Sequence, residues 1–480
     1  MKILITGATG FIGGRLLQSL QDHPVAPDQR LIALRRNPAG NLSNQAANPT
    51  EWRTCDLFSL RQIEAATVDC DIAVYLVHSM LPAARLNQAS FEDTDLILAD
   101  NFARACRKNG VRRIIYLGGL IPDHRELSAH LRSRLEVESA LAAYGAEVVT
   151  LRAGLILGAE GSSFQILSQL VRNLPILGCP KWTRNITQPI AVPDAIRLLR
   201  HAIRDQALPA GSYDIGGPDV LSYQALMQET GKALGLRRRF VEIPLFSPGL
   251  SLLWVQLITG ASRNLVTPLI QSLKYEMVVR NRELLERAGT PGIPLAKALQ
   301  DSLRELKPTL RSSTQNRKLM LREKREVRSI QRLPLPAGKN AAWVTQEYFR
   351  WLPRSLAPFI RVGKDESNSD TPATWHFKFL GIPWSLLKLR EAPDRSTTDR
   401  TVLMISGGLL VARDAHPNAR LEFREVLGGT QVLAAIHDFK PRLPWPIYKL
   451  TQAIAHLWVM ARFRAYLRLS NSKLSLAANP

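Results

Sequence analysis

The residues best suited to bind an anion stand at the start of the chain. Gly7, Gly10 and Gly13 recur every three residues within the stretch Thr6–Gly14. The first two glycines permit a tight turn and a close backbone approach, and the third permits close packing of a helix on a sheet. The N–H groups at a helix N-terminus attract phosphate. The spacing therefore predicts a cradle for a diphosphate, although it reads GxxGxxG and not GxGxxG.

A strand and a helix must position this cradle. Met1–Ile5 is a short apolar run typical of a buried strand, and the apolar residues of Phe11–Leu20 recur at helical spacing. We expect the backbone amides between Thr9 and Ile12 to hold the diphosphate, the alternative being an ordinary glycine-rich turn. The residues assigned to the cradle are Gly7, Thr9, Gly10, Phe11, Ile12 and Gly13.

Two arginines follow the second predicted strand, which covers Arg30–Leu34. In a dinucleotide-binding fold this strand end faces the adenosine ribose, where an acid would bind the 2′-hydroxyl and an arginine a 2′-phosphate. Arg35 and Arg36 stand there without an acid. They predict NADP(H) as the cofactor, with NAD(H) second. The alternative is an exposed basic turn.

Strands and helices alternate along the rest of the first 150 residues. Further strands are predicted at Asp71–Val77, Val111–Leu117 and Glu147–Leu151, with helices at Phe91–Asn109 and Leu127–Tyr144. This order predicts an α/β fold with a doubly wound parallel sheet. His78 and Gly118 follow two of these strands, at the carboxyl ends where such sheets bind ligands. Asp56 ends another extended run and could reach an adenine amine.

These motifs together resemble the extended and atypical short-chain dehydrogenases/reductases. The matching pieces are Thr6–Gly13, Arg35–Arg36, Cys55–Leu57, Tyr75–Met80 and Tyr116–Leu120. His130–Arg134 and Gln188–Val192 bring the chain closer to a bacterial subgroup of atypical members, many with a C-terminal domain of unknown function. The resemblance covers residues 1–305 and implies a Rossmann domain with a small substrate lobe. It also implies that Asp56, Leu57, Val77, His78 and Gly118 join the cradle around the cofactor.

The chain departs from this family at the catalytic positions. Active members carry Ser or Thr after the fifth strand and a YxxxK pair on the next helix, whereas this chain has Gly118-Gly119 and then His130 and Arg134. In one interpretation His130, with an ordinary pKa near 6.5, donates a proton while Arg134 fixes the cofactor ribose or phosphate. In the other, both lie on a solvated helix face and the family's catalysis is lost.

Composition gives the wider setting. A chain of 480 residues predicts two or three domains. A net charge of +22 favours anionic partners, although charge spread over a soluble surface is the alternative. The four cysteines form no CxxC pair, which predicts neither zinc nor a disulfide framework. The first residues enter a strand directly, so no signal peptide and a cytoplasmic location are expected.

Two segments raise the question of a membrane. Ile243–Ser262 carries no charged side chain, but its prolines and polar residues favour a buried or interfacial helix over a span. Residues 306–340 are predicted to be a basic linker, because Arg304–Arg332 holds ten basic residues and three acidic ones. Simple solvation, or secondly contact with anionic lipid, is expected for the linker. No nucleic-acid binding is predicted, because aromatic interleaving is missing.

Residues 341–475 are predicted to form an α+β domain. Strand patterns cover Thr374–Gly381, Leu386–Arg390, Arg400–Val411, Arg420–Leu427 and Thr430–Phe439, and a long helix covers Trp445–Leu469. This element order resembles the helix-grip, START-like folds, which implies an apolar ligand. The alternation from Arg420 to Arg424 predicts a sheet with one wet face.

Three hypotheses on function follow. In the first, the protein is an NADP(H)-dependent reductase or epimerase of a hydrophobic metabolite. In the second, it is a sensor or assembly factor that binds NADPH without turnover. In the third, it is an adaptor at a membrane surface.

Overall fold

The structure is a computed structural model that describes residues 1–36, 50–79, 86–124, 126–243, 256, 258, 263–289, 291–306, 326–365 and 372–477. It divides into two compact units. The first unit comprises Met1–Leu81 and Leu98–Leu310, and the second comprises Pro82–Ile97 and Arg311–Pro480. Most of the uncharged segment Ile243–Ser262 and of the basic linker lies outside the described residues.

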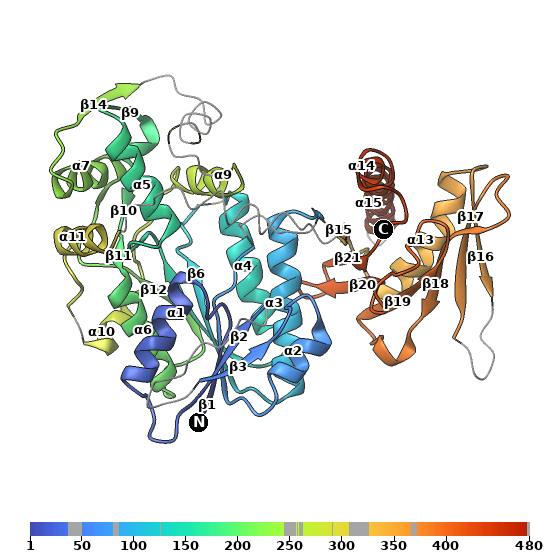
Figure 1. The fold of residues 1–480 in the computed structure, drawn as a ribbon, viewed down its shortest axis with the longest axis horizontal. Helices are drawn as coiled ribbons and strands as arrows, with labels where there is room; N and C mark the ends of the chain where they lie inside the picture. Colours follow the sequence, from blue (N-terminus) through green and yellow to red (C-terminus); the bar gives the residue numbers. More distant parts are fainter. Residues whose placement is uncertain are drawn as a thin grey trace. The chain divides into compact units, whose positions relative to one another are not determined.

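The sheet of the first unit has seven strands in the order β12-β7-β6-β4-β1-β2-β3 (Figure 1). The strands are β1 (Lys2–Ile5), β2 (Arg30–Arg35), β3 (Thr50–Thr54), β4 (Ile72–Tyr75), β6 (Arg113–Gly119), β7 (Glu147–Ala153) and β12 (Gly211–Ile215). Every neighbouring pair is parallel. The predicted doubly wound parallel sheet is confirmed.

The strand order reverses direction at β1. The chain passes outward from β1 to β2 and β3, and then crosses to β4 on the other side of β1. In open α/β sheets the crevice at such a reversal, beyond the carboxyl ends of the strands, binds the ligand. The turns after β1 and β4 therefore border the site.

Helices cover both faces of this sheet (Figure 1). One face carries α1 (Phe11–Asp22) and α6 (Val192–Arg204), and the other carries α2 (Leu60–Ala66), α3 (Phe91–Lys108) and α4 (Ala129–Ala142). Leu16, Leu20 and Leu199 are fully buried in the core between α1, α6 and the strands. Residues 91–97 of α3 are grouped with the second unit, and its remainder belongs to the first.

Shorter elements after β7 build the lobe of the first unit. The helices are α5 (Ser162–Asn173), α7 (Tyr223–Ala233), α9 (Arg263–Ser272), α10 (Glu283–Ala288) and α11 (Leu295–Glu305), with the short 3-10 helix η1 (Lys181–Arg184). The strands are β8 (Ile156–Leu157), β9 (Ile176–Pro180), β10 (Ile186–Thr187), β11 (Ile190–Ala191), β13 (Leu221–Ser222) and β14 (Arg239–Ile243). They pair in three small sheets beside the main one.

The second unit has one sheet in the order β16-β17-β18-β19-β20-β21-β15-β5. Its strands are β5 (Leu86–Gln88), β15 (Val327–Pro334), β16 (Ile360–Asp365), β17 (Thr374–Phe379), β18 (Ser385–Glu391), β19 (Arg400–Gly407), β20 (Arg420–Val426) and β21 (Gln431–Phe439), with the 3-10 helix η2 (Pro393–Arg395) before β19. All neighbours are antiparallel except β15 and β5. The predicted antiparallel sheet is confirmed. Part of the range expected to be linker is instead the strand β15.

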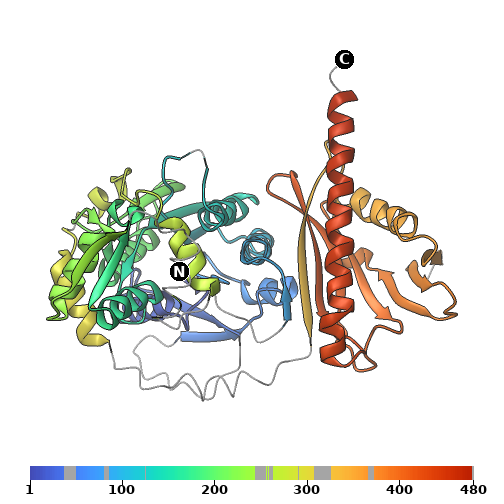
Figure 2. The ribbon, with the colours of Figure 1, turned by 90° about the horizontal axis from the view of Figure 1, so that it is seen from above.

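Two helices pack on one face of that sheet, α13 (Ala341–Ser355) and α15 (Gln452–Ala477) (Figure 2). Phe349 of α13 and Phe463 of α15 share a buried cluster with Phe423 of β20. The predicted closing helix is divided in two, because Thr451 leaves helical geometry between α14 (Trp445–Leu450) and α15. Among the described residues, no helix is both long and apolar enough to cross a bilayer.

Candidate functional site

The turn after β1 has the shape that the glycines predict. Gly7 has a φ of +64°, and a Cβ there would lie 2.8 Å from the carbonyl oxygen of Leu76. A Cβ on Gly13 would lie 2.2 Å from the carbonyl oxygen of Gly7. Both distances are too short for any side chain, so the turn requires glycine at both positions for steric reasons.

The N-terminus of α1 is open to an anion. Its N-cap is Gly10, which offers no side-chain hydrogen bond, and its first turn has no acidic residue. Thr9 and Gly10 are exposed, while Phe11 and Ile12 are half-buried. First-turn N–H groups without a capping side chain attract a phosphate through hydrogen bonds and the helix dipole. The residues present therefore fit a diphosphate.

Thr6 joins the two turns that border the crevice, a role that the sequence did not reveal. Its side chain is fully buried. Its Oγ1 donates to the carbonyl oxygen of Val74 at 3.1 Å and accepts from the N–H of Leu76 at 2.9 Å. The glycine turn after β1 is thereby fixed to the segment after β4, where Val77 and His78 stand.

Arg35 lies at the carboxyl end of β2, as predicted. Its guanidinium carbon is 5.7 Å from the centre of the Trp52 ring, which belongs to the adjacent strand β3. Stacking on an aromatic face orients a guanidinium while its N–H donors remain usable. Arg36, the next residue, is exposed. The contact between Trp52 and Arg35 was not predicted. The sequence could have indicated it, because Trp52 lies in an extended run that follows the strand ending at Arg35.

Asp56 and Leu57 follow β3 at the same edge of the sheet. The Oδ1 of Asp56 accepts from the N–H of Phe58 at 3.1 Å, so this oxygen is engaged within its own turn. Leu57 is buried, and its carbonyl oxygen accepts from the Asn101 side chain at 2.9 Å. These contacts hold the turn at the edge where a nucleotide base would bind. A direct contact between Asp56 and an adenine amine stays a prediction.

His78 and Arg134 are in contact. The Nη1 of Arg134 donates to the imidazole Nδ1 of His78 and lies 3.3 Å from its Nε2. His78 follows β4 at the open edge of the sheet, and part of its surface is exposed. Protein atoms surround the rest of its ring. Desolvation, the Arg134 charge and His130 lower the pKa of His78 well below 6.5. Since a guanidinium can only donate, the contact itself also requires a neutral imidazole.

His130 does not have the ordinary pKa that the sequence analysis assumed. Burial, with a contribution from Arg134, lowers the pKa of His130 to about 3. The ring is therefore neutral at physiological pH and lacks the pKa near 6.5 that the proposed role assumed, and the role of His130 as a proton donor stays a prediction. Arg134, only 3% exposed, provides the lasting positive charge. It does not lie on a solvated helix face, which was the alternative interpretation.

A side chain at Gly118, near the end of β6, would be crowded. A Cβ on Gly118 would lie 3.0 Å from the Tyr116 ring and 3.4 Å from the Thr150 methyl group. A Cβ on Gly119 would lie 3.4 Å from the Cγ of Arg134. Gly118 thus has little room for a side chain, whereas a Cβ on Gly119 would make an ordinary contact with the aliphatic part of Arg134.

The glycine turn and the parallel sheet agree with the family that the sequence matches. Residues 3–216 match the NAD dependent epimerase/dehydratase family. The recognition of a short-chain dehydrogenase-like domain is thus confirmed. The first unit is an NAD(P)-binding domain of this type.

Curated relatives match only part of the chain. The auxiliary protein GraX of Staphylococcus aureus is 33% identical over 151 residues, which is 31% of this chain and 43% of GraX. An uncharacterized Mycobacterium tuberculosis protein, Rv2047c, is 22% identical over 234 residues, which is 49% of this chain and 24% of that protein. This chain therefore spans less than half the length of these relatives.

Solved structures share the fold of the first unit. A nucleoside-diphosphate-sugar epimerase from Staphylococcus aureus matches with a TM-score of 0.51 and 16% identity, over 62% of this chain and 100% of that one. The NADPH-dependent quinone oxidoreductase QOR2 of Escherichia coli, solved with NADPH, matches with a TM-score of 0.50 and 20% identity, over 62% and 98%. At these identities the likeness shows the fold alone.

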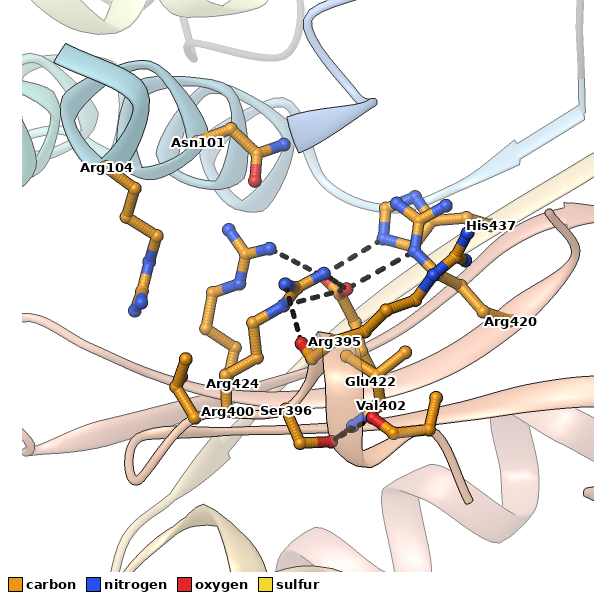
Figure 3. Close-up of polar contacts among 12 residues, drawn as sticks. Asn101, Arg104, Arg395, Ser396, Arg400, Val402, Arg420, Glu422, Arg424 and His437 are labelled. Carbon is orange, nitrogen blue, oxygen red and sulfur yellow. Dashed lines mark hydrogen bonds and ion pairs between the residues drawn. The ribbon is translucent and has the colours of Figure 1, made fainter. Parts of the chain in front are cut away.

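The second unit holds a buried polar cluster that the sequence analysis missed. Figure 3 shows four side chains converging on Glu422: Arg400, Arg420, Arg424 and His437. Arg400 donates to Glu422 Oε2 at 2.7 Å, and Arg424 donates to Oε1 at 2.9 Å. Burial alone would raise the pKa of Glu422, but the charges of Arg400 and Arg424, together with His437, hold it well below 4.5. Both carboxylate oxygens are thus occupied by the protein, which marks the cluster as structural.

The predicted wet face of β20 is wrong. Arg420, Glu422 and Arg424 alternate with apolar residues as expected, but all three are buried. Alternating charge was read as solvent exposure, whereas here the charges satisfy one another. Among the described residues, no group of three His, Cys, Asp or Glu side chains could hold a metal ion.

Proposed function

We propose that the first unit binds NADP(H) in preference to NAD(H) and uses it to reduce a small, apolar carbonyl or quinone-type substrate. The position of Arg35 carries the cofactor part of the proposal. Its guanidinium lies over the Trp52 ring at the end of β2, the strand end that faces the adenosine ribose in dinucleotide-binding folds generally, and the next residue is another arginine. A guanidinium forms paired hydrogen bonds with a phosphate.

Arg134 supplies the electrostatics for the reaction. When a substrate carbonyl accepts hydride at its carbon, the electron pair of the C=O bond moves to oxygen and leaves a negative charge there. The nicotinamide supplies this hydride when bound. A buried guanidinium, fixed by His78, stabilises that charge until the oxygen takes a proton from water.

The neutral histidines favour reduction over epimerisation. Epimerisation of a sugar needs a group that removes a proton, and the family's tyrosine and lysine are replaced here. His130, with a pKa of about 3, and His78, with a pKa well below 6.5, are weak bases. The charge that remains, on Arg134, suits a step in which negative charge develops on oxygen.

Apolar side chains adjoin this charge. Leu120 follows the Gly118-Gly119 strand end, Leu131 precedes Arg134 by less than a turn of α4, and both pack with Met277. These three side chains are buried against one another, so the surroundings of Arg134 are partly apolar, which supports an apolar molecule with one reducible oxygen.

Calorimetric titration with NADPH and with NADH tests the cofactor assignment. A hydrogen bond to a charged group contributes about 1.5–3 kcal/mol, so Arg35→Ala should weaken NADPH about 10- to 100-fold and leave NADH nearly unchanged. Arg30→Ala is the matched control, because Arg30 is an exposed arginine at the other end of the same strand. Equal losses for the two coenzymes, or no binding of either, would contradict the assignment.

A non-catalytic NADPH-binding role is the second candidate. The observation that favours it is that Gly118, Gly119 and His130 replace the hydroxyl and tyrosine of active family members. Oxidation of bound NADPH, followed by absorbance with a panel of quinones and aldehydes, separates the two. In a reductase, Arg134→Gln should slow turnover by at least tenfold and Arg134→Lys by less, since lysine keeps the charge. Bound NADPH that no substrate oxidises would favour the second candidate.

A further inference from the structure

The last two helices of the second unit present an apolar face to solvent. Six large side chains on α14 and α15 are exposed by more than a third: Ile447 (48%), Leu450 (74%), Ile454 (56%), Leu457 (38%), Trp458 (48%) and Leu469 (65%). From Ile454 to Leu469 they recur at intervals that place them on one side of α15. We refer to these six residues as the outer face.

The opposite side of α15 is equally apolar. Met460, Phe463 and Leu467 are buried in the core beneath the sheet, and the His456 ring lies against Ser329 at 2.9 Å. A helix on the surface of a globular protein ordinarily has a polar side toward water, and a helix that is apolar all round is ordinarily covered all round. The outer face therefore has the composition of a contact surface.

The chain segment that carries the outer face contains charge of one sign, although Lys440 at its start forms an ion pair with Asp414 of a neighbouring segment. No Asp or Glu occurs from Phe439 to Pro480. The basic residues in this range are Lys440, Arg442, Lys449, Arg462, Arg464, Arg468 and Lys473. Lys449 lies 5.1 Å from the Trp445 ring and Arg462 lies 4.9 Å from the Trp458 ring, so aromatic and basic groups are interleaved. Arg464 differs, because it donates to the carbonyl oxygen of Arg332 in the core.

We propose that the outer face lies on an anionic lipid surface. Exposed apolar residues with tryptophan would enter the headgroup region, and Lys449, Arg462 and Arg468 would contact anionic headgroups. The alternatives fit less well. A second copy would bring the same basic residues against each other, and binding to a nucleic acid would leave the exposed leucine and isoleucine side chains unburied. The proposal is independent of the proposed function, since its residues belong to the other unit.

Vesicle flotation with the full-length protein tests this proposal. Wild-type protein should float with vesicles of mixed phosphatidylglycerol and phosphatidylcholine, remain at the bottom with pure phosphatidylcholine, and be released by high salt. Each basic residue near an anionic surface contributes about 1 kcal/mol, or about fivefold. Lys449→Gln, Arg462→Gln and Arg468→Gln together should therefore weaken binding on the order of a hundredfold.

Apolar variants separate the outer face from charge alone. Ile454→Ser, Leu457→Ser and Trp458→Ser together should weaken vesicle binding at least tenfold, because three exposed apolar side chains leave the lipid. The matched control is Trp384→Ser, an exposed tryptophan (67%) on the β17–β18 hairpin at the far edge of the same sheet. Circular dichroism and thermal unfolding of all variants show that both units remain folded.

Direct contact is measured by quenching of tryptophan fluorescence with brominated lipid. Wild-type fluorescence should fall on binding, and Trp458→Phe should remove most of that fall while the protein still floats. Three outcomes would overturn the proposal: wild type that does not float, an outer-face variant that floats like wild type, and a wild-type dimer that the apolar triple variant converts to a monomer. The last outcome would assign the face to a second copy of the chain.

Discussion

Gly13 and its neighbour Gly14 provide a matched pair for testing the glycine turn. Both lie in α1, where replacing glycine by alanine gains about 1 kcal/mol of helix propensity. A Cβ on Gly14 would lie 3.5 Å from the carbonyl oxygen of Ala8, an ordinary contact. A Cβ on Gly13 would lie 2.2 Å from the Gly7 oxygen and 2.9 Å from the Ala8 Cα, and all of these are backbone atoms of the cradle. The helix or the turn must move to accommodate it.

The magnitudes follow from these distances. Overpacking costs typically about 1–3 kcal/mol, so Gly13→Ala should be less stable than Gly14→Ala by about 1–3 kcal/mol, because the propensity gain is the same in both variants and cancels in the comparison. The displaced N-terminus of α1 should also lose its hold on the diphosphate, and NADPH affinity should fall at least tenfold. Thermal unfolding with and without NADPH measures both effects. Wild-type stability and affinity in Gly13→Ala would show that the close approach of helix and turn does not position the amides.

Two further predictions concern buried polar groups. Thr6→Val removes the hydroxyl that bridges Val74 and Leu76, and it should lower the free energy of unfolding, measured with urea, by about 1–3 kcal/mol. Thr6→Ser keeps the hydroxyl and should lower it by less. Equal losses in the two variants would exclude the bridge as the cause. The second unit should lose stability in acid. Burial and Arg420 lower the pKa of His437 to about 4, so below pH 6.5 this histidine is protonated in the unfolded chain and not in the folded one, and stability falls. Glu422 has a pKa well below 4.5 in the folded protein, so stability continues to fall at still lower pH. The protection factors of the β20 and β21 amides, which are corrected for the slower intrinsic exchange at lower pH, should decrease from pH 7 to pH 5. His437→Gln should reduce this decrease, and unchanged protection factors in wild type would refute the reasoning.

The first unit was predictable because its signals are local. Gly7 and Gly13 are read from spacing, and the strand that ends at Arg35 is read from an apolar run, so the sheet and the cofactor side of the site follow from short stretches of chain. The second unit was predicted less completely. β5 has three residues, too few for a pattern, and β15 lies in a stretch whose positive charge indicated a linker. Tertiary pairing with β21 outweighs that local composition.

The chemistry of the site was the least predictable part, and the reason is physical. A pKa depends on which groups are neighbours in space, and His78 and Arg134 are separated by 56 positions in sequence. From sequence, His130 was a histidine on a helix face with its ordinary pKa. In the fold it is half-buried next to a permanent positive charge. Desolvation and this charge lower its pKa to about 3, and Arg134 is left as the group that can stabilise an anion. Replacement of tyrosine and lysine by histidine and arginine therefore does not preserve the family's proton transfer in another form. Under the proposed function, it removes the titrating group and retains the positive charge, which suits steps that need a fixed cation and no protein base.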